Sequence, residues 1–374
     1  MKNFIFSLFL FVLFGCSNEK KGDVQNFVAG FKTIQTKDTS RFYKPNTDTS
    51  DYLHYRPLDI DIWYPAIASS KDTALHFRNL LGLLETRANY YTASNIGNGF
   101  ANQIAQFFCE SLQCSDSSKL LNYKTETYKN ALNAKGKYPL VIYLSSFNGM
   151  SYENFTLFEQ LAKKGYVVIS INSIGRFPGD MTMKNEDLIE QVNDAVSTLN
   201  VLKGDNNIDF DRIGIVGYSW GGLAGSILAN KIPQLSCLIS LDGSEFHHFG
   251  SEIEEDNDFI GISNSIEFRN MKISAPYLRL ESASNGAKAK KDSVYNFSQK
   301  LNVKPQILVI DSAIHEDFGC LVDLVKKSGN CKPESKFDII SRLTLSFLED
   351  KLKNRKTFST LVDKEIGKRT ILKK

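Results

Sequence analysis

The sequence lacks a strong charge of one sign, any internal repeat and any low-complexity linker. Its 45 Lys and Arg residues nearly balance 42 Asp and Glu residues, giving a formal net charge of +3, so composition predicts no nucleic-acid partner. After residue 15, no segment is apolar enough to span a membrane. Histidine and cysteine are scarce, with five and six residues. Hydrophobic residues at 42% and charged residues at 23% are typical of a globular protein with a sizeable core.

The first 15 residues are typical of a signal peptide. Lys2 gives a positive start, and Phe4–Phe14 is an almost unbroken apolar run that is too short to span a bilayer permanently. The run leads to Leu13-Phe14-Gly15-Cys16, which resembles the bacterial lipobox, whose Cys is diacylated and becomes the mature N-terminus. The resemblance implies lipidation at Cys16 and a lipid anchor in the bacterial cell envelope, at the outer membrane or cell surface. We interpret the polar residues 16–30 as a tether.

Apolar segments alternate with amphipathic ones from Tyr138 onward, after a first alternating strand at 56–64. Strands that are apolar throughout and alternate with helices indicate a mostly parallel central sheet with helices on both faces. The pattern therefore predicts the α/β class. Predicted strands are 56–64, 138–144, 166–171, 212–216, 235–241, 276–280 and 306–310, and predicted helices are 152–164, 185–203, 223–230, 316–327 and 336–353.

One domain over residues 31–353 is the simplest organisation that these patterns predict. Residues 67–134 contain helical patches and many aromatics but no strand rhythm. We interpret them as a helical insertion, either a cap over a site or a unit whose aromatics form its own core. The basic residues 354–374 are predicted to be a solvated tail.

The motif Gly217-Tyr218-Ser219-Trp220-Gly221 lies between a predicted strand and a predicted helix. A G-x-S-x-G sequence occurs by chance in many chains, so its setting matters more than its letters. At a strand-to-helix turn, the Ser backbone is strained and the hydroxyl is raised above the sheet, while the glycines avoid collisions with neighbouring elements. Ser219 is therefore the candidate nucleophile. The alternative is a Gly-rich turn with a helix-capping Ser.

A serine nucleophile needs a base, and His315 is the candidate because it alone among the histidines follows the last predicted core strand. A surface-loop histidine is the alternative for that position. The adjacent His247 and His248 lack the usual spacing of metal ligands, so we predict no metal site there. The orienting acid is either Asp242 or Glu281, because each ends a predicted strand and keeps the order Ser, acid, His.

From Arg56 to Phe318 the sequence resembles the platelet-activating-factor acetylhydrolase and dienelactone-hydrolase-like branch of the α/β-hydrolases. The resemblance implies the α/β-hydrolase fold with a serine nucleophile. In the acetylhydrolases the catalytic Asp lies in a Leu-Asp-Gly/Ala segment after the strand that follows the nucleophile helix, which favours Asp242 over Glu281. The segments that carry the resemblance are RPLDIDIWYPA, YPLVIYLSSFNG, YENFTLFEQLAKKGYVVISIN, GYSWGG, CLISLDGS and the strand that leads to His315.

Two backbone donors are needed for an oxyanion hole. One is expected to be the N–H of Trp220, directly after the nucleophile. The second is expected from the loop after YPLVIYL, where the family usually carries His-Gly and this sequence has Ser146-Phe147-Asn148-Gly149. Phe147 and Asn148 are both candidates for that donor.

These residues predict acyl transfer to Ser219 and hydrolysis of carboxylic esters, with no metal or organic cofactor. The bulky Phe100, Phe107 and Phe108 in the insertion, Trp220 beside the nucleophile and Phe147 near the oxyanion hole predict a preference for short acyl groups. A peptidase or amidase with the same residues, and a non-catalytic surface-binding lipoprotein, are the alternatives. A small-molecule or lipid ester is the expected substrate.

Cysteine spacing gives one further expectation, because disulfides persist in an oxidising compartment. Cys320 and Cys331 bracket a short helical stretch just after His315. We predict a disulfide between them that limits the mobility of the loop carrying His315.

Overall fold

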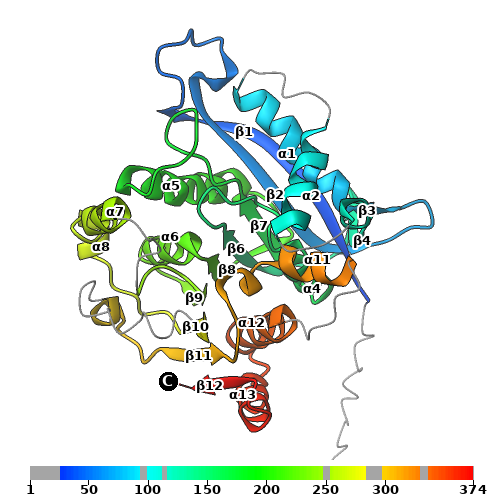
Figure 1. Cartoon of the computed structure of the whole chain (residues 1–374), viewed down its shortest axis with the longest axis vertical. Helices are drawn as coiled ribbons and strands as arrows, with labels where there is room; N and C mark the ends of the chain where they lie inside the picture. Colours follow the sequence, from blue (N-terminus) through cyan, green and yellow to red (C-terminus); the bar gives the residue numbers. More distant parts are fainter. Residues whose placement is uncertain are drawn as a thin grey trace, which may run out of the picture.

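The computed structural model describes residues 26–92, 99–111, 116–246, 253–283, 297–328 and 336–373. These residues form one 12-stranded sheet with helices on both faces (Figure 1). The strand order is β12-β11-β10-β9-β8-β6-β7-β2-β1-β4-β3, and β5 pairs with β2. The mostly parallel sheet predicted from the sequence is therefore confirmed.

Six neighbouring strands in the middle of the sheet run parallel. Their side chains are buried almost throughout, because helices cover both faces and each strand meets apolar neighbours on either side. The carboxyl ends of these strands share one edge, where the candidate site forms. The strands are β6 (Tyr138–Leu144), β7 (Val167–Ile171), β8 (Ile208–Tyr218), β9 (Leu235–Leu241), β10 (Tyr277–Ser282) and β11 (Gln306–Ile310).

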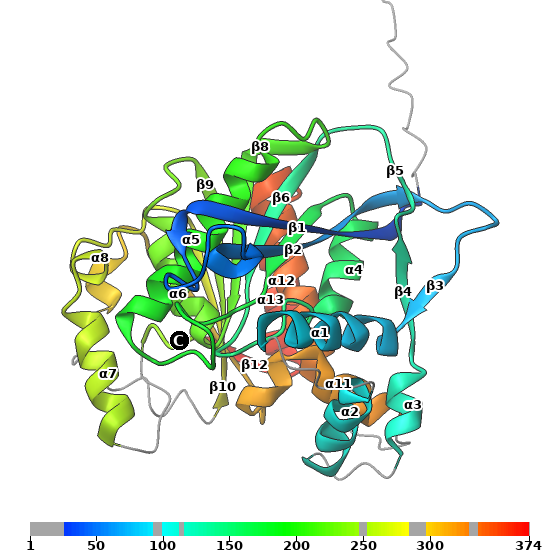
Figure 2. The same cartoon turned by 90° about the horizontal axis from the view of Figure 1, so that it is seen from above.

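Helices divide into two groups, one on each face of the sheet (Figure 2). Each group buries its apolar stripe against the strands, so the molecule has one hydrophobic core above the sheet and one below it. One group is α5 (Asn185–Leu202), α6 (Trp220–Ala229), α7 (Ile253–Ser263) and α8 (Ile266–Arg269), and the other is α4 (Phe155–Lys163), α11 (Cys320–Ser328) and α12 (Lys336–Lys353).

A long antiparallel pair at the start of the described chain was only half predicted. Strand β2 (Tyr55–Ile67) pairs with β7 and with β1 (Val28–Phe42). The short helix η1 (Tyr52–His54) joins the pair. Most of β1 is polar and part-exposed, which hides its strand pattern in the sequence. Because β1 begins at Val28, the interpretation of residues 16–30 as a tether is wrong for its last three residues.

The insertion before β6 contains strands as well as helices, so the prediction that it lacks strands is wrong. Strand β4 pairs with β1 and with β3 at the sheet edge. The buried side chains of β4 are Thr125 and Thr127, and no apolar alternation marks them in the sequence. The elements are β3 (Ala74–His76), α1 (Phe77–Thr92), α2 (Phe100–Ser111), α3 (Ser117–Leu121), β4 (Lys124–Lys129) and β5 (Leu132–Asn133).

The C-terminal segment belongs to the folded domain, so the prediction of a solvated tail at 354–374 is wrong. Helix α13 (Phe358–Gly367) buries Phe358, and β12 (Ile371–Lys373) pairs antiparallel with β11 and buries Ile371. These few apolar positions anchor an otherwise basic stretch. Of the helices in the described ranges, none is long and apolar enough to cross a membrane. The signal peptide, Cys16, His247, His248 and Cys331 lie outside the described residues.

Candidate active site

Ser219 lies on the sharp turn between β8 and α6, at the carboxyl edge of the sheet. Its backbone has φ 56° and ψ −121°, a strained conformation for a non-glycine residue, and its side chain does not cap the helix. A Cβ on Gly217 would lie 2.1 Å from the carbonyl oxygen of Gly221, and one on Gly221 would lie 2.0 Å from that of Leu144. Only glycine fits at either position, so the motif is a true nucleophile elbow in its geometry.

His315 begins the short helix η4 (His315–Phe318) beyond β11. Its Nε2 lies 3.0 Å from Ser219 Oγ, and its Nδ1 lies 2.7 Å from Asp242 Oδ2. The ring of Tyr218 stacks against the imidazole, with centroids 5.2 Å apart, and the Tyr218 hydroxyl donates to the carbonyl of His315. The imidazole is therefore held in position to take a proton from the serine hydroxyl.

Asp242 follows β9 and is fully buried. Its Oδ1 accepts a hydrogen bond from the backbone N–H of Ser282 at 2.8 Å. Burial alone would raise the pKa of this carboxyl, but the hydrogen bond and charge of His315 lower it below its usual value. The carboxylate is thus ionised at neutral pH and can stabilise a protonated imidazole. Glu281, the alternative acid, instead accepts from Arg279 Nε at 2.7 Å.

Arg279 supports the loop that carries Asp242, and it was not among the predicted site residues. The guanidinium is fully buried; its Nη1 donates to the carbonyl of Gly243 and to Glu245 Oε1, both at 2.9 Å. Together with the bond to Glu281, these contacts fix the backbone just after Asp242. A charged residue in the middle of an apolar strand, YLRLE, is the signal that could have revealed it.

The loop after β6 offers donors for an oxyanion hole. In the described part of the chain, the backbone N–H groups of Phe147, Asn148 and Trp220 have no protein acceptor, whereas that of Ser146 donates to Glu153 Oε1 at 2.8 Å. The backbone N–H groups of Phe147 and Asn148 are therefore both available, together with that of Trp220, to donate to an oxyanion. The side chain of Asn148 accepts from the backbone of Met181, so the loop is tied down on that side too.

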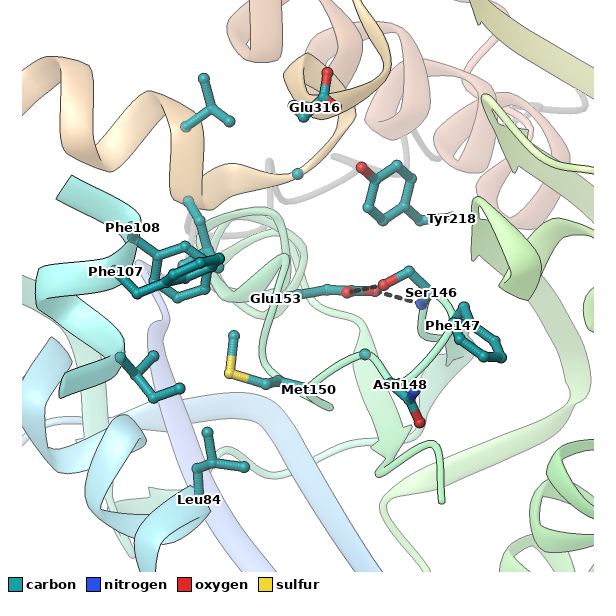
Figure 3. Close-up of a pocket in the computed structure, with 15 residues that line it drawn as sticks. Leu84, Phe107, Phe108, Ser146, Phe147, Asn148, Met150, Glu153, Tyr218 and Glu316 are labelled. Atoms are coloured by element: carbon teal, nitrogen blue, oxygen red, sulfur yellow. Dashed lines mark hydrogen bonds between the residues drawn. The ribbon is translucent and has the colours of Figure 1, made fainter. Parts of the chain in front are cut away.

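Glu153 lies beneath this loop and fixes its shape (Figure 3). It also accepts hydrogen bonds from Ser146 Oγ at 2.6 Å and from the Tyr143 hydroxyl at 2.8 Å. Burial raises the pKa of the carboxyl to about 7. A Cβ on Gly149 would lie 2.7 Å from Glu153 Oε2, so glycine is needed for the loop to wrap around the acid. No motif marks Glu153 in the sequence.

A cavity of about 510 Å³ opens beside these residues. Phe107 and Phe108 of α2 and Leu84 of α1 form one wall, and the loop from Ser146 forms another (Figure 3). The same helices bury other apolar side chains in the main core. The insertion therefore lines a space at the site, and its buried apolar side chains join the core of the domain rather than forming a core of their own. Phe100, at the start of α2, does not line this cavity.

The disulfide predicted at Cys320 is wrong in this structure. Cys320 is a buried free thiol whose Sγ donates to the carbonyl of Glu153 at 2.9 Å. Burial raises the pKa of the thiol to about 12, so it stays protonated and unreactive. The side chain at the first position of α11 turns toward the core. The loop carrying His315 is instead held by hydrogen bonds to the start of α4.

Comparison with known proteins gives a matching family model and a similar solved structure. A family model described as X-Pro dipeptidyl-peptidase (S15 family) matches residues 99–249, which include Ser219 and Asp242. No curated protein sequence matches the chain. The solved structure of ferulic acid esterase from Streptomyces cinnamoneus is similar, with a TM-score of 0.62 and 18% identity over 88% of this chain and 92% of that one.

The chain has the α/β-hydrolase fold. The matching family model describes a peptidase, whereas the similar solved structure is that of an esterase. At 18% identity the structural likeness shows the fold alone. In the described ranges of the chain, no group of three or more His, Cys, Asp or Glu side chains is arranged to hold a metal ion.

Proposed function

We propose that the chain is a serine hydrolase that cleaves carboxylic esters with Ser219 as nucleophile, His315 as base and then acid, and Asp242 as the orienting acid. We place it in the platelet-activating-factor acetylhydrolase and dienelactone-hydrolase-like branch. The observation that carries the proposal is the continuous pair of contacts, 3.0 Å from Ser219 Oγ to His315 Nε2 and 2.7 Å from His315 Nδ1 to Asp242. No cofactor is needed for this chemistry.

The reaction proceeds in two halves. His315 Nε2 takes the hydroxyl proton as Ser219 Oγ bonds to the ester carbonyl carbon. The carbonyl oxygen gains negative charge and faces the free backbone N–H groups of Trp220 and of the loop from Ser146 to Gly149, which we call the oxyanion loop. His315 then gives the proton to the leaving alcohol oxygen as the bond to the carbonyl carbon breaks. In the second half, His315 takes a proton from water as the water oxygen bonds to the acyl carbon. The proton then returns to Ser219 Oγ as the acyl-enzyme bond breaks, which releases the acid and free Ser219. Asp242 keeps the imidazole in the required tautomer throughout.

A preference for short acyl groups is part of the proposal. The ring of Phe147 stands edge-on to that of Trp220, with centroids 5.8 Å apart, next to the nucleophile and the oxyanion donors. This pair of rings limits the space for a long acyl chain on its side of the site.

A peptidase or amidase is the second candidate, because the family model that matches residues 99–249 describes an X-Pro dipeptidyl-peptidase. The same three residues would serve either bond. The paired serine, histidine and aspartate argue against a purely binding role. We also propose that the chain is held at the cell envelope through a lipid on Cys16, on the strength of the lipobox-like Leu13-Phe14-Gly15-Cys16.

A fluorophosphonate probe tests the nucleophile, because only an activated serine reacts. The intact protein should be labelled, and Ser219→Ala should not be; labelling of neither would contradict the proposal. A series of p-nitrophenyl esters from acetyl to octanoyl, run beside an X-Pro p-nitroanilide, tests the bond and acyl length. We expect kcat/KM to be highest for acetyl to butyryl esters. Higher values for the anilide would establish the peptidase instead.

The proposed anchor has a separate test. Wild-type protein expressed with its leader should enter the membrane fraction and incorporate a labelled fatty acid, and Cys16→Ser should do neither. Equal membrane association and labelling of both proteins would contradict a lipid on Cys16.

A further inference from the structure

The cavity beside the site has walls from four separate parts of the chain. They are α1, α2, the loop from Ser146 to Met150, and the segment from Glu316 to Val322 (Figure 3). Tyr218, which precedes the nucleophile, completes the lining. The cavity is therefore lined by the sequence neighbours of Ser219 and His315 and by the loop that offers the oxyanion donors, although Ser219 and His315 are not themselves among its lining residues.

The position of His315 decides which half of an ester the cavity faces. His315 must give its proton to the leaving oxygen, so the alcohol half lies on the imidazole side of the acyl carbon. Glu316 and Gly319, which continue the His315 segment, line the cavity, and so does Tyr218, which stacks on the imidazole. Phe147 lines the cavity as well, and its ring packs against Trp220, so a short acyl group beside the nucleophile leaves the rest of the cavity to the alcohol.

The walls are apolar and one aromatic ring is left uncovered. Phe107 is 62% exposed even though it lines a cavity, and its neighbour Phe108 lies 5.9 Å away between ring centroids. A ring or branched alkyl group entering the cavity would remove this apolar surface from water. Leu84, Ile104 and Met150 extend the apolar lining behind the two rings.

The acidic and basic side chains that line the cavity are all acids. Among the described residues that line it, Glu153 and Glu316 are acids and none is a lysine, arginine or histidine. Glu153 is buried beneath the loop, while Glu316 is exposed to solvent. An anionic group on the substrate would meet these acids without any cation to offset the repulsion and the loss of hydration.

We propose that the cavity receives the alcohol half of the ester and selects uncharged alcohols with a ring or branched apolar group, rejecting anionic ones. This substrate class rests on the proposed ester hydrolysis. It extends that proposal because it assigns a specificity role to Phe107 and Glu316, neither of which touches the reacting atoms.

Matched acetate esters test the ring. We expect kcat/KM for benzyl acetate to exceed that for methyl acetate by at least about tenfold, since one well-placed ring supplies that discrimination. Phe107→Ala should lower this ratio about fivefold, and Phe42→Ala, which removes another exposed ring that does not line the cavity, should leave it unchanged. Methyl phenylacetate, which carries the ring on the acyl half, should gain nothing over methyl acetate. An equal gain there would overturn the assignment to the alcohol.

A second matched pair tests the charge. 4-Carbamoylbenzyl acetate and 4-carboxybenzyl acetate have nearly the same shape and differ in charge, and we expect the amide to be preferred by about tenfold or more. Glu316→Gln should narrow that preference severalfold, and Glu267→Gln on α8 should not. Equal kcat/KM for the two esters would overturn the proposed selection. If no ester is turned over and Ser219 is not labelled by a fluorophosphonate, the proposed function itself fails; an active enzyme indifferent to the ring and the charge contradicts only this inference.

Discussion

Asn154 accepts a hydrogen bond from the backbone N–H of Cys320 at 2.8 Å, across a separation of 166 residues. Its Nδ2 also donates to the carbonyl of Phe318 at 3.1 Å. The adjacent Glu153 holds Ser146 in the oxyanion loop. These two neighbouring residues therefore fix the His315 loop and the oxyanion loop relative to each other.

Replacing Asn154 tests this coupling. We expect Asn154→Ala to lower kcat about tenfold or more with little change in KM, because a small displacement of His315 weakens proton transfer in the transition state. Loss of the Asn154 hydrogen bonds to the Cys320 N–H and to the Phe318 carbonyl should cost about 1–3 kcal/mol of unfolding free energy. Asn264→Ala, at an exposed site after α7, is the control for both measurements. A destabilised variant with wild-type kcat would show that Asn154 does not position the base.

The acid assignment predicts opposite effects at two buried carboxylates. Asp242→Asn should lower kcat by several orders of magnitude, because the amide favours the wrong imidazole tautomer. Glu281→Gln keeps an oxygen acceptor for Arg279, so kcat should stay within about threefold. It should nevertheless lose about 3 kcal/mol of unfolding free energy, because the buried guanidinium loses one of its charged partners. Steady-state kinetics and urea unfolding measure the two effects, and the reverse result for kcat would make Glu281 the acid.

The central strands and the residues Ser219, Asp242 and His315 could be predicted because short stretches of the sequence mark each of them. Apolar runs mark β6, β9 and β11, whose bounds agree with the prediction, and the candidate serine, acid and histidine all follow strand ends. Strand β4 was missed because its buried face is threonine. Residues such as Asn154 and Arg279 act through contacts across the fold, and neither short-range spacing nor residue type reveals which distant backbone groups they meet.

Phe147 offers a test of acyl specificity. Its ring packs against Trp220, so Phe147→Gly should open space beside the nucleophile. We expect kcat/KM for octanoyl relative to acetyl p-nitrophenyl esters to rise about tenfold, about 1.4 kcal/mol of transition-state binding. Phe42→Ala serves again as the distant control. An unchanged ratio, with the acetyl ester still hydrolysed, would show that another group limits acyl length.

Glu159 makes the stability of the fold depend on pH. It is 3% exposed on α4 and accepts hydrogen bonds from the Thr127 hydroxyl at 2.6 Å and the Glu126 N–H at 2.7 Å. Burial raises the pKa of this carboxyl from 4.5 to about 7. Between these values the folded chain keeps a proton that the unfolded chain releases. The stabilising contribution is therefore full below about pH 4.5 and is lost as pH rises through about 7.

Glu159→Gln should remove this dependence, because glutamine does not titrate. The free energy of unfolding of the variant minus that of the wild type should rise by about 3 kcal/mol between pH 4.5 and pH 8, the energy that corresponds to the raised pKa. Taking the difference cancels the titration of all other groups that the two proteins share. Urea unfolding at closely spaced pH values measures it. A difference that stays constant, or that falls with pH, would contradict a buried carboxyl that keeps its proton to about pH 7.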